Sequence, residues 1–210
     1  SGRRHSEGAL LATTVGLAGA SAVLAGLGWP IARVLAFGEA ARGGYAPLAH
    51  TLICFGLTLL FPGLIWVLTR MLFSVDDARG AALTSLGLAV AGVVGMGIAA
   101  DVALRSDRAP ALALGSGLAN VIGVVLMAVR YRSRTGWLGV RSWARPAFGA
   151  LAVATATGLG LFALADLFPA SRAGSAGALM VLAPLGIGVF FLLTRVIGGR
   201  PLRQILRWDG

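Results

Sequence analysis

Six long apolar stretches, separated by short polar segments, constrain the fold of this chain more than any other feature. The hydrocarbon core of a bilayer is about 30 Å thick, and an α-helix needs about 20 apolar residues to cross it. Only Asp166, near the end of the fifth stretch, places a charge within these stretches. They are residues 9–30, 47–69, 80–100, 110–129, 147–168 and 174–194. The sequence therefore predicts six transmembrane helices.

The composition excludes a water-soluble globule. Of the 210 residues, 57% are hydrophobic and only 12% are charged, and the mean hydropathy is +0.85. So few polar side chains cannot cover the surface of a soluble protein of this length. The stretches also lack the sustained alternation of apolar and polar residues that a transmembrane β-barrel requires. We therefore expect an all-α membrane protein.

The arginines predict the orientation of the helices, because the chain contains no lysine. If the first residues are cytoplasmic, thirteen of the eighteen arginines lie on the cytoplasmic side and five on the other. This bias places both termini of the segment in the cytoplasm. It also accounts for most of the net charge of +10, which favours contact with anionic membrane lipids. The sequence shows no basic soluble face of the kind that binds nucleic acid.

Glycine and proline predict how the helices pack. A face of small side chains lets another backbone approach closely, so we expect the third helix to be buried among its neighbours. This face recurs every four residues, at Gly87, Ala91, Gly95 and Ala99. Pro62 and Pro184 each remove a backbone donor at membrane depth, which predicts kinks in the second and sixth helices. Kinks suit a protein that changes shape, and static irregular packing explains them equally well.

Polar residues at membrane depth are functional candidates by default, and this chain has few. His50 and Asn120 are two of them, and we favour hydrogen bonds between helices over proton relay for both. A zinc protease would need a His-Glu-x-x-His motif, but His5 and His50 are the only histidines. Ser85 and Ser116 have no neighbouring base that we can nominate. The sequence therefore predicts neither an enzyme nor a metal or cofactor site.

The segment LTRMLFSVDDARG, residues 68–80, concentrates charge in the predicted turn between the second and third helices. It contains Arg70, Asp76, Asp77 and Arg79. The simpler interpretation is a solvated turn whose aspartates cap the following helix. A contact with substrate or with another part of the protein is the alternative.

Residues 68–83 also resemble a segment of the MurJ/MviN-type lipid II flippases, which belong to the MOP exporter superfamily. That family carries an arginine, an aromatic pair and then Asp-x-Arg/Lys-Thr-Pro between two C-terminal helices. The residues that match in register are Arg70, Phe73, Asp77 and Arg79. Gly80 and Ala81 stand where the family usually has Thr-Pro, so we expect the start of the third helix to be less sharply fixed.

Two further segments resemble the same family in order and spacing. AGLGWPIARVLAFGE is similar to a helix that ends in Pro-Ile-x-x-Leu-Phe-x-x-Gly, and it matches at Pro30, Ile31, Leu35 and Gly38. ALALGSGLANVIGVVLMAVRYR is similar to a helix that runs into a basic loop, and it matches at Leu112, Leu114, Ser116, Leu118 and Asn120.

The resemblance implies that the chain corresponds to helices nine to fourteen of a fourteen-helix flippase in the bacterial cytoplasmic membrane. Such proteins are thought to move undecaprenyl-linked peptidoglycan precursor across the membrane by alternating access, without covalent chemistry. A first lobe bearing most of the cationic cavity residues would precede this chain. The expected parts are a cytoplasmic loop remnant (1–8), four helices of the second lobe (9–132), a basic cytoplasmic loop (133–146), the last two helices (147–197) and a cytoplasmic tail (198–210).

The resemblance implies a role for the last two helices, and it leads to a hypothesis for the charged turn. The last two helices would form a groove for the prenyl tail, unless they simply face bulk lipid. Arg70 and Asp77 would contact the first lobe and close the cavity, with Arg79, Asn120 and His50 as further candidates for substrate contact or gating.

Two other functions stay open from the sequence. An exporter of the same superfamily that carries a polysaccharide-linked lipid or a drug would share the fold. The chain could instead be a non-transporting scaffold that anchors partners through the loop RYRSRTGWLGVRSWAR, residues 130–145. For that loop, plain membrane anchoring with Trp137 and Trp143 at the interface is the simpler interpretation.

Overall fold

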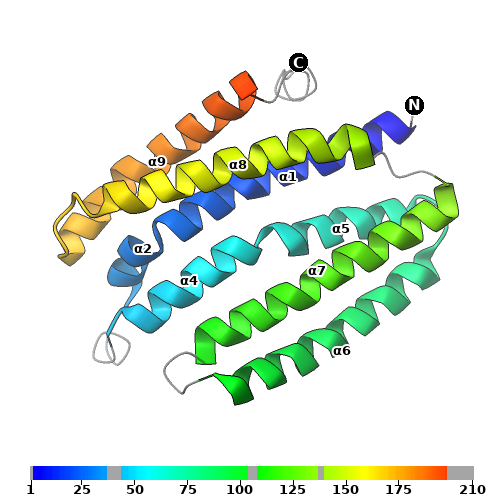
Figure 1. Cartoon of the computed structure of the whole chain (residues 1–210), viewed down its shortest axis with the longest axis horizontal. Helices are drawn as coiled ribbons and strands as arrows, with labels where there is room; N and C mark the ends of the chain where they lie inside the picture. The colour runs from blue at the N-terminus through cyan, green and yellow to red at the C-terminus, as the bar shows by residue number, and fades with distance from the viewer. Residues whose placement is uncertain (1, 37–43, 104–107, 137–139, 198–210) are drawn as a thin grey trace.

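All regular secondary structure in the described part of the chain is α-helical. The computed structural model describes residues 2–36, 44–103, 108–136 and 140–197, without the side chains of 2–7, 140–145 and 197 (Figure 1). The helices are α1 (Gly2–Gly26), α2 (Gly28–Leu35), α4 (Ala46–Thr58), α5 (Leu60–Phe73), α6 (Ala78–Val102), α7 (Arg108–Thr135), α8 (Val140–Ala165) and α9 (Arg172–Ile197).

Six helical stretches are long and apolar enough to cross a membrane, as the sequence predicts. They are Gly8–Gly26, Ala46–Phe73, Ala78–Val102, Arg108–Thr135, Pro146–Ala165 and Arg172–Val196. The chain is an all-α, multi-pass membrane protein. One boundary differs from expectation, because α1 begins at Gly2 and residues 2–8 are therefore helical rather than loop. Residues 137–139 of the predicted basic loop and the predicted tail, 198–210, lie outside the described residues.

Proline explains why two of the apolar stretches are each divided into two helices. The second stretch breaks at Leu59, between α4 and α5, because Pro62 has no N–H to donate to the carbonyl of Thr58. This break confirms the predicted interruption. In the first stretch, Pro30 has the same relation to Gly26, where α1 ends and α2 begins. The sixth stretch differs, since Pro184 lies inside the continuous helix α9.

The long helices lie side by side in a row (Figure 1). Each helix packs on the next in the order α9, α8, α1, α4–α5, α7 and α6. The last two helices therefore return to pack on the first one, although more than a hundred residues separate α1 from α8. Short α2 lies between α4 and α9, and the Arg172 side chain at the start of α9 donates a hydrogen bond to the Val34 carbonyl of α2.

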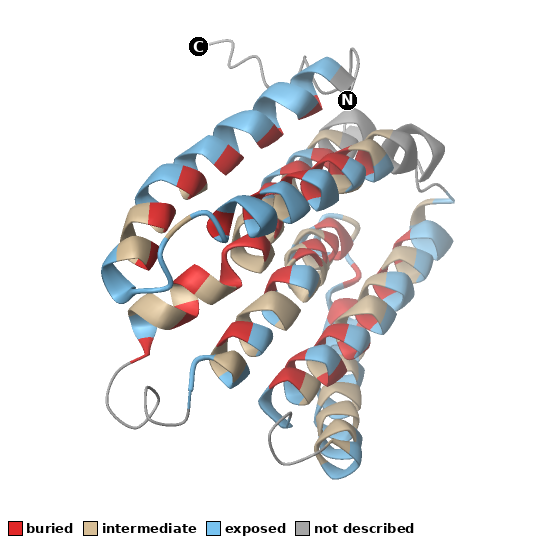
Figure 2. Cartoon of the chain, turned by 60° about the vertical axis from the view of Figure 1, so that its left-hand side comes forward, coloured by how far each residue is buried: buried red, intermediate tan, exposed pale blue. Residues whose placement is uncertain are grey.

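The buried side chains lie between neighbouring helices of this row and do not form a single core. Three small apolar clusters fill the contacts between neighbouring helices, and they centre on Leu72, Phe190 and Leu27. Buried positions form stripes on the faces that meet another helix (Figure 2). The outward faces carry exposed leucine, valine and phenylalanine side chains, such as Phe148 and Leu192, which suits contact with lipid tails.

The third span, α6, contradicts the prediction that it is buried among its neighbours. It lies at one edge of the row, and only 6% of its most apolar stretch is buried. The small-residue face does permit a close approach, but to α7 alone. A Cβ added at Gly115 of α7 would lie 2.9 Å from the carbonyl oxygen of Gly95. The small-residue face therefore packs on one neighbouring helix only. Gly87, on the same face, has open space beside it.

Candidate functional site

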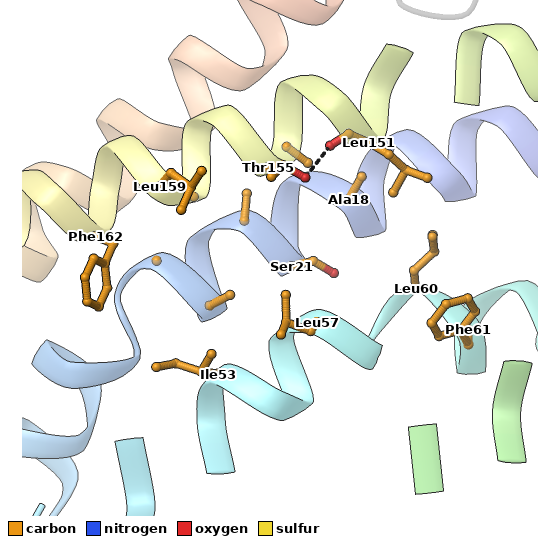
Figure 3. Close-up of a pocket in the computed structure, with 15 residues that line it drawn as sticks. Ala18, Ser21, Ile53, Leu57, Leu60, Phe61, Leu151, Thr155, Leu159 and Phe162 are labelled. Carbon is orange, nitrogen blue, oxygen red and sulfur yellow. Dashed lines mark hydrogen bonds between the residues drawn. The ribbon is translucent and has the colours of Figure 1, made fainter. Parts of the chain in front are cut away.

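An apolar groove runs along α1 between α8 and the α4–α5 pair (Figure 3). It encloses about 450 Å³, within the range of about 300–1,000 Å³ typical of small-molecule sites. Phe162 lies toward one end and Phe61 toward the other, while Ala18 and Ser21 line the floor. No lining residue is charged.

Small residues and the broken second span create this groove. A Cβ added at Gly26 would lie 2.6 Å from the Gly158 carbonyl oxygen, so α1 and α8 approach closely. A Cβ added at Gly56 would lie 2.7 Å from the Ala25 nitrogen, which brings α4 equally close to α1. The break at Leu59 then separates α4 from α5. The large side chains of Leu60 and Phe61, at the start of α5, line this side of the groove.

Two hydroxyl groups line the groove, in different states. Thr155 donates to the Leu151 carbonyl of its own helix at 2.9 Å, and Figure 3 shows this bond. The Ser21 hydroxyl oxygen is buried and has no hydrogen-bond partner among the described residues. Of these two hydroxyl groups, only that of Ser21 makes no hydrogen bond to a described residue.

Between the last two helices, where the resemblance implies a groove for a prenyl tail, the structure has a smaller cavity, and its role stays a prediction. A cavity of about 180 Å³ lies between α8 and α9, next to Gly160 and Gly186. It is also free of charged side chains. The larger apolar space thus lies on the other side of α8, where it faces α1 and α4–α5.

The charged segment forms a second site, in the turn where α5 ends and α6 begins. Asp77 is buried and accepts hydrogen bonds from Arg130, from Nε at 2.6 Å and from the second terminal nitrogen at 3.0 Å. Arg134, one turn further along α7, approaches the same carboxylate at 3.4 Å. The Gly80 backbone N–H also donates to Asp77, at 3.2 Å. We call Asp77, Arg130 and Arg134 the charge clamp.

Asp77 therefore caps α6, as the simpler interpretation of the sequence predicts. The start of α6 is sharply fixed despite the missing Thr-Pro, because the Asp77 side chain and the bound arginine define it. Gly80 has a second role there. A methyl group at this position would overlap the Arg130 guanidinium, so the absence of a side chain makes room for the ion pair.

Asp76 has a different role from its neighbour. It is exposed and has a φ of +56°, the left-handed conformation in which many helices terminate. Its N–H donates to the Phe73 carbonyl, and the Asp77 N–H donates to the Leu72 carbonyl. This pair of bonds is the Schellman motif, which ends α5 and turns the chain into α6.

The ion pair changes the acidity of the clamp. Hydrogen bonds from Arg130 lower the pKa of the Asp77 carboxyl to about 2, although burial acts in the opposite direction. The charges of Arg130 and Arg134 and the Gly80 N–H add to the lowering. Asp77 is thus ionised at every physiological pH.

The structure does not bring the other charged candidates into the clamp. The Arg70 guanidinium lies over the exposed ring of Trp66, 4.8 Å from its centroid, one turn earlier on α5. Arg79 is exposed and makes no ion pair or hydrogen bond within the described part of the chain. A contact of Arg70 or Asp77 with a further lobe stays a prediction.

The two polar candidates at depth lie apart from both sites. His50 is exposed on α4 and meets the Trp29 ring of α2 edge-on, with centroids 5.7 Å apart. Arg33 lies 5.9 Å from the same tryptophan ring. The contact joins two helices, but it is aromatic, and no hydrogen bond of the kind favoured for His50 joins it to another described residue. Asn120 is partly buried on α7, and no hydrogen bond joins its side chain to another described residue.

Sequence reasoning missed Arg130 and Arg134, which were counted only as orientation signals. They stand 53 and 57 residues after Asp77, so no local pattern joins them to it. Their spacing of four residues, just after the end of the apolar stretch 110–129, was the available signal. The groove was missed for a similar reason, because residues of four helices, α1, α4, α5 and α8, line it.

The sequence matches no protein-family model, and the comparisons with curated proteins and with solved structures found no match.

Proposed function

We propose that this chain is part of a lipid II flippase, which moves undecaprenyl-linked peptidoglycan precursor across the bacterial cytoplasmic membrane by alternating access. The three motif resemblances suggest the family. The observation that carries the proposal is the uncharged groove between α1, α4–α5 and α8, because a long prenyl chain requires an apolar path and no charges.

The groove offers a physical reason for binding a hydrocarbon tail. Along α8 it extends from Leu151 to Phe162, which corresponds to roughly 16 Å at 1.5 Å per residue. The tail exchanges lipid neighbours for protein neighbours there, so the gain comes from close packing rather than from water exclusion. The head group would remain outside this groove, in a polar part of the transport path.

Photocrosslinking tests the groove directly. A photoreactive residue in place of Leu57 faces the groove, whereas one in place of Val93 lies on the exposed face of α6. In membranes that contain both phospholipid and polyprenyl-linked precursor, we expect crosslinks to the polyprenyl lipid to be enriched at position 57. Equal crosslinking at both positions would mean that bulk lipid fills the groove, and the proposal would lose its support.

Rescue of a strain depleted of its own lipid II flippase tests the activity. The coding sequence that contains this segment should restore growth. Failure to rescue together with crosslinks to a different lipid-linked sugar would point to another exporter of the superfamily. Failure to rescue together with loss of a partner after neutralising the arginines of residues 130–145 would favour the scaffold.

The predicted contact with a first lobe is best tested at Arg70, which touches Trp66 and is not part of the clamp. Arg70→Ala should lower rescue while the unfolding temperature stays close to that of the wild type. Asp77→Ala would also lower rescue, but through loss of the clamp as well. If both variants rescue fully, Arg70 and Asp77 have no role in closing the cavity.

A further inference from the structure

The two arginines of the charge clamp bind the Asp77 carboxylate unequally, and Arg134 is the more distant of the two. Arg130 takes both oxygens of Asp77, at 2.6 and 3.0 Å. Arg134 reaches them only at 3.4 Å, and 56% of its side chain is exposed. One carboxylate therefore neutralises one of two arginines, and the excess positive charge lies on Arg134.

Among the described side chains of α5, α6 and α7 at this end, no second anion accompanies Arg134. The neighbouring charged residues at this end of α5, α6 and α7 are Arg70, Asp76, Arg79, Asp77, Arg130 and Arg132. Asp76 is the only other acidic residue of that set, and no ion pair joins it to an arginine within the described ranges. The patch is thus strongly positive, and its charge is complementary to an anionic partner.

The position of Arg134 fits the head-group level of a membrane. It lies in the last turn of the span Arg108–Thr135. On the neighbouring helix, the exposed ring of Trp66 lies under the Arg70 guanidinium, an arrangement of aromatic and basic side chains that is typical of the membrane interface.

We infer that Arg134 binds the phosphate of an anionic glycerophospholipid from the leaflet at this end of the helices. The planar guanidinium presents paired N–H donors that match two phosphate oxygens. Arg130 stays with Asp77, so the α5–α6 turn and the start of α6 keep their structure when the lipid binds. Asp77 in turn limits the affinity, because its charge repels the incoming phosphate. This lipid site is independent of the proposed transport of a lipid-linked precursor.

Native mass spectrometry of the protein in mixed micelles of phosphatidylglycerol and phosphatidylcholine tests the site. Arg134→Gln should lower the affinity for phosphatidylglycerol about fivefold, the effect of one basic residue at a membrane surface. Asp77→Asn should raise the affinity by a similar factor. The matched control is Arg108→Gln, an exposed arginine at the opposite end of the same helix, which should leave the affinity for bound lipid within twofold.

Several outcomes would overturn the inference. Equal losses in Arg134→Gln and Arg108→Gln would show general attraction to charge, and equal binding of phosphatidylcholine would show no head-group preference. Inorganic pyrophosphate carries the same phosphate chemistry without acyl chains. If it displaces phosphatidylglycerol, the patch recognises a soluble anion and the lipid assignment is wrong.

Folding is controlled separately in this experiment. Arg134→Gln keeps the two short bonds between Arg130 and Asp77, so its unfolding temperature should match that of the wild type. Arg134→Lys keeps the charge but not the paired donors, and it should bind with intermediate affinity. An Arg134→Lys variant as weak as Arg134→Gln at an unchanged unfolding temperature supports bidentate binding, and one with full wild-type affinity contradicts it.

Discussion

At the scale of single residues, two adjacent aspartates have opposite functions in one turn. Asp76 is exposed and supplies the left-handed residue that ends α5, whereas Asp77 is buried and joins α6 to Arg130 of α7. Sequence alone cannot separate the two, because both fit the position of a helix cap. The difference follows from the long-range partner and the backbone conformation.

This difference predicts a pH-dependent effect of Asp77→Asn. The folded-state pKa of about 2 lies below the usual value, so ionised Asp77 stabilises the fold at neutral pH and loses this effect as the pH falls from about 4 toward 2. Thermal unfolding should therefore show a constant deficit for Asp77→Asn between pH 8 and pH 5, and a shrinking deficit in more acidic buffer. Asp76→Asn should unfold like the wild type throughout, since asparagine also tolerates a positive φ.

The glycines of α6 provide a second prediction at this scale. Alanine is the better helix former, so Gly97→Ala, which has open space beside it, should stabilise the protein by about 0.5–1 kcal/mol. Gly80→Ala should instead lower the unfolding temperature, because its methyl group displaces Arg130 from Asp77. A Gly80→Ala variant as stable as Gly97→Ala would show that the ion pair contributes nothing to the fold.

At the scale of helices, the break at Leu59 separates two halves of one span and opens a wall of the groove. Apolar length predicts the existence of this span well, and Pro62 predicts where it breaks. The extra turn at Leu27 was not predicted, although Pro30 supplies the same signal, because its position near the end of the stretch suggested a helix end only.

Pro62→Ala tests whether this break serves a purpose. Alanine restores the N–H that can donate to the Thr58 carbonyl, so α4 and α5 should form one straighter helix and the groove should narrow. We expect equal or higher thermal stability together with weaker photocrosslinking of polyprenyl lipid from position 57. Pro184→Ala, a change within the unbroken helix α9, is the matched control and should leave crosslinking unchanged. Unaltered crosslinking in Pro62→Ala would mean that other contacts shape the groove.

The edge position of α6 shows where sequence patterns mislead. A stripe of small residues indicates that a helix approaches another one closely, and α6 does approach α7 in this way at Gly95 and Gly115. The stripe cannot say how many partners the helix has. Its remaining faces carry Val93, Ile98 and other exposed apolar residues, which a lipid environment accepts as readily as a protein interior.

At the scale of the whole molecule, hydropathy could not predict the order in which the helices pack side by side. The number of spans and their lengths follow from composition and spacing. Their neighbours do not, because every span is apolar enough to face either lipid or another helix. The return of α8 and α9 to α1 depends on shape, through close contacts such as that of Gly158 with Ala22.

Disulfide crosslinking checks this arrangement in a Cys54→Ala background, which removes the native thiol. A Cβ added at Gly158 would lie 3.5 Å from the Ala22 Cα atom, so cysteines at positions 22 and 158 should form a disulfide on mild oxidation. Cysteines at positions 119 and 158 place one thiol on α7 and one on α8, the next helix along the chain, and they should stay reduced. The reverse result would place α8 beside α7 and would contradict the row.

The return of α8 to α1 also affects how the protein is made. The α1 helix leaves the ribosome about 140 residues before α8 is complete, a delay of roughly 7–28 s at 5–20 residues per second. During this time, its small-residue face has no helix from the second half of the chain to pack on. Biogenesis therefore includes an interval in which α1 depends on lipid, the insertion machinery or an assembly factor, and slowing translation before α8 should lengthen that interval and increase degradation of the nascent protein.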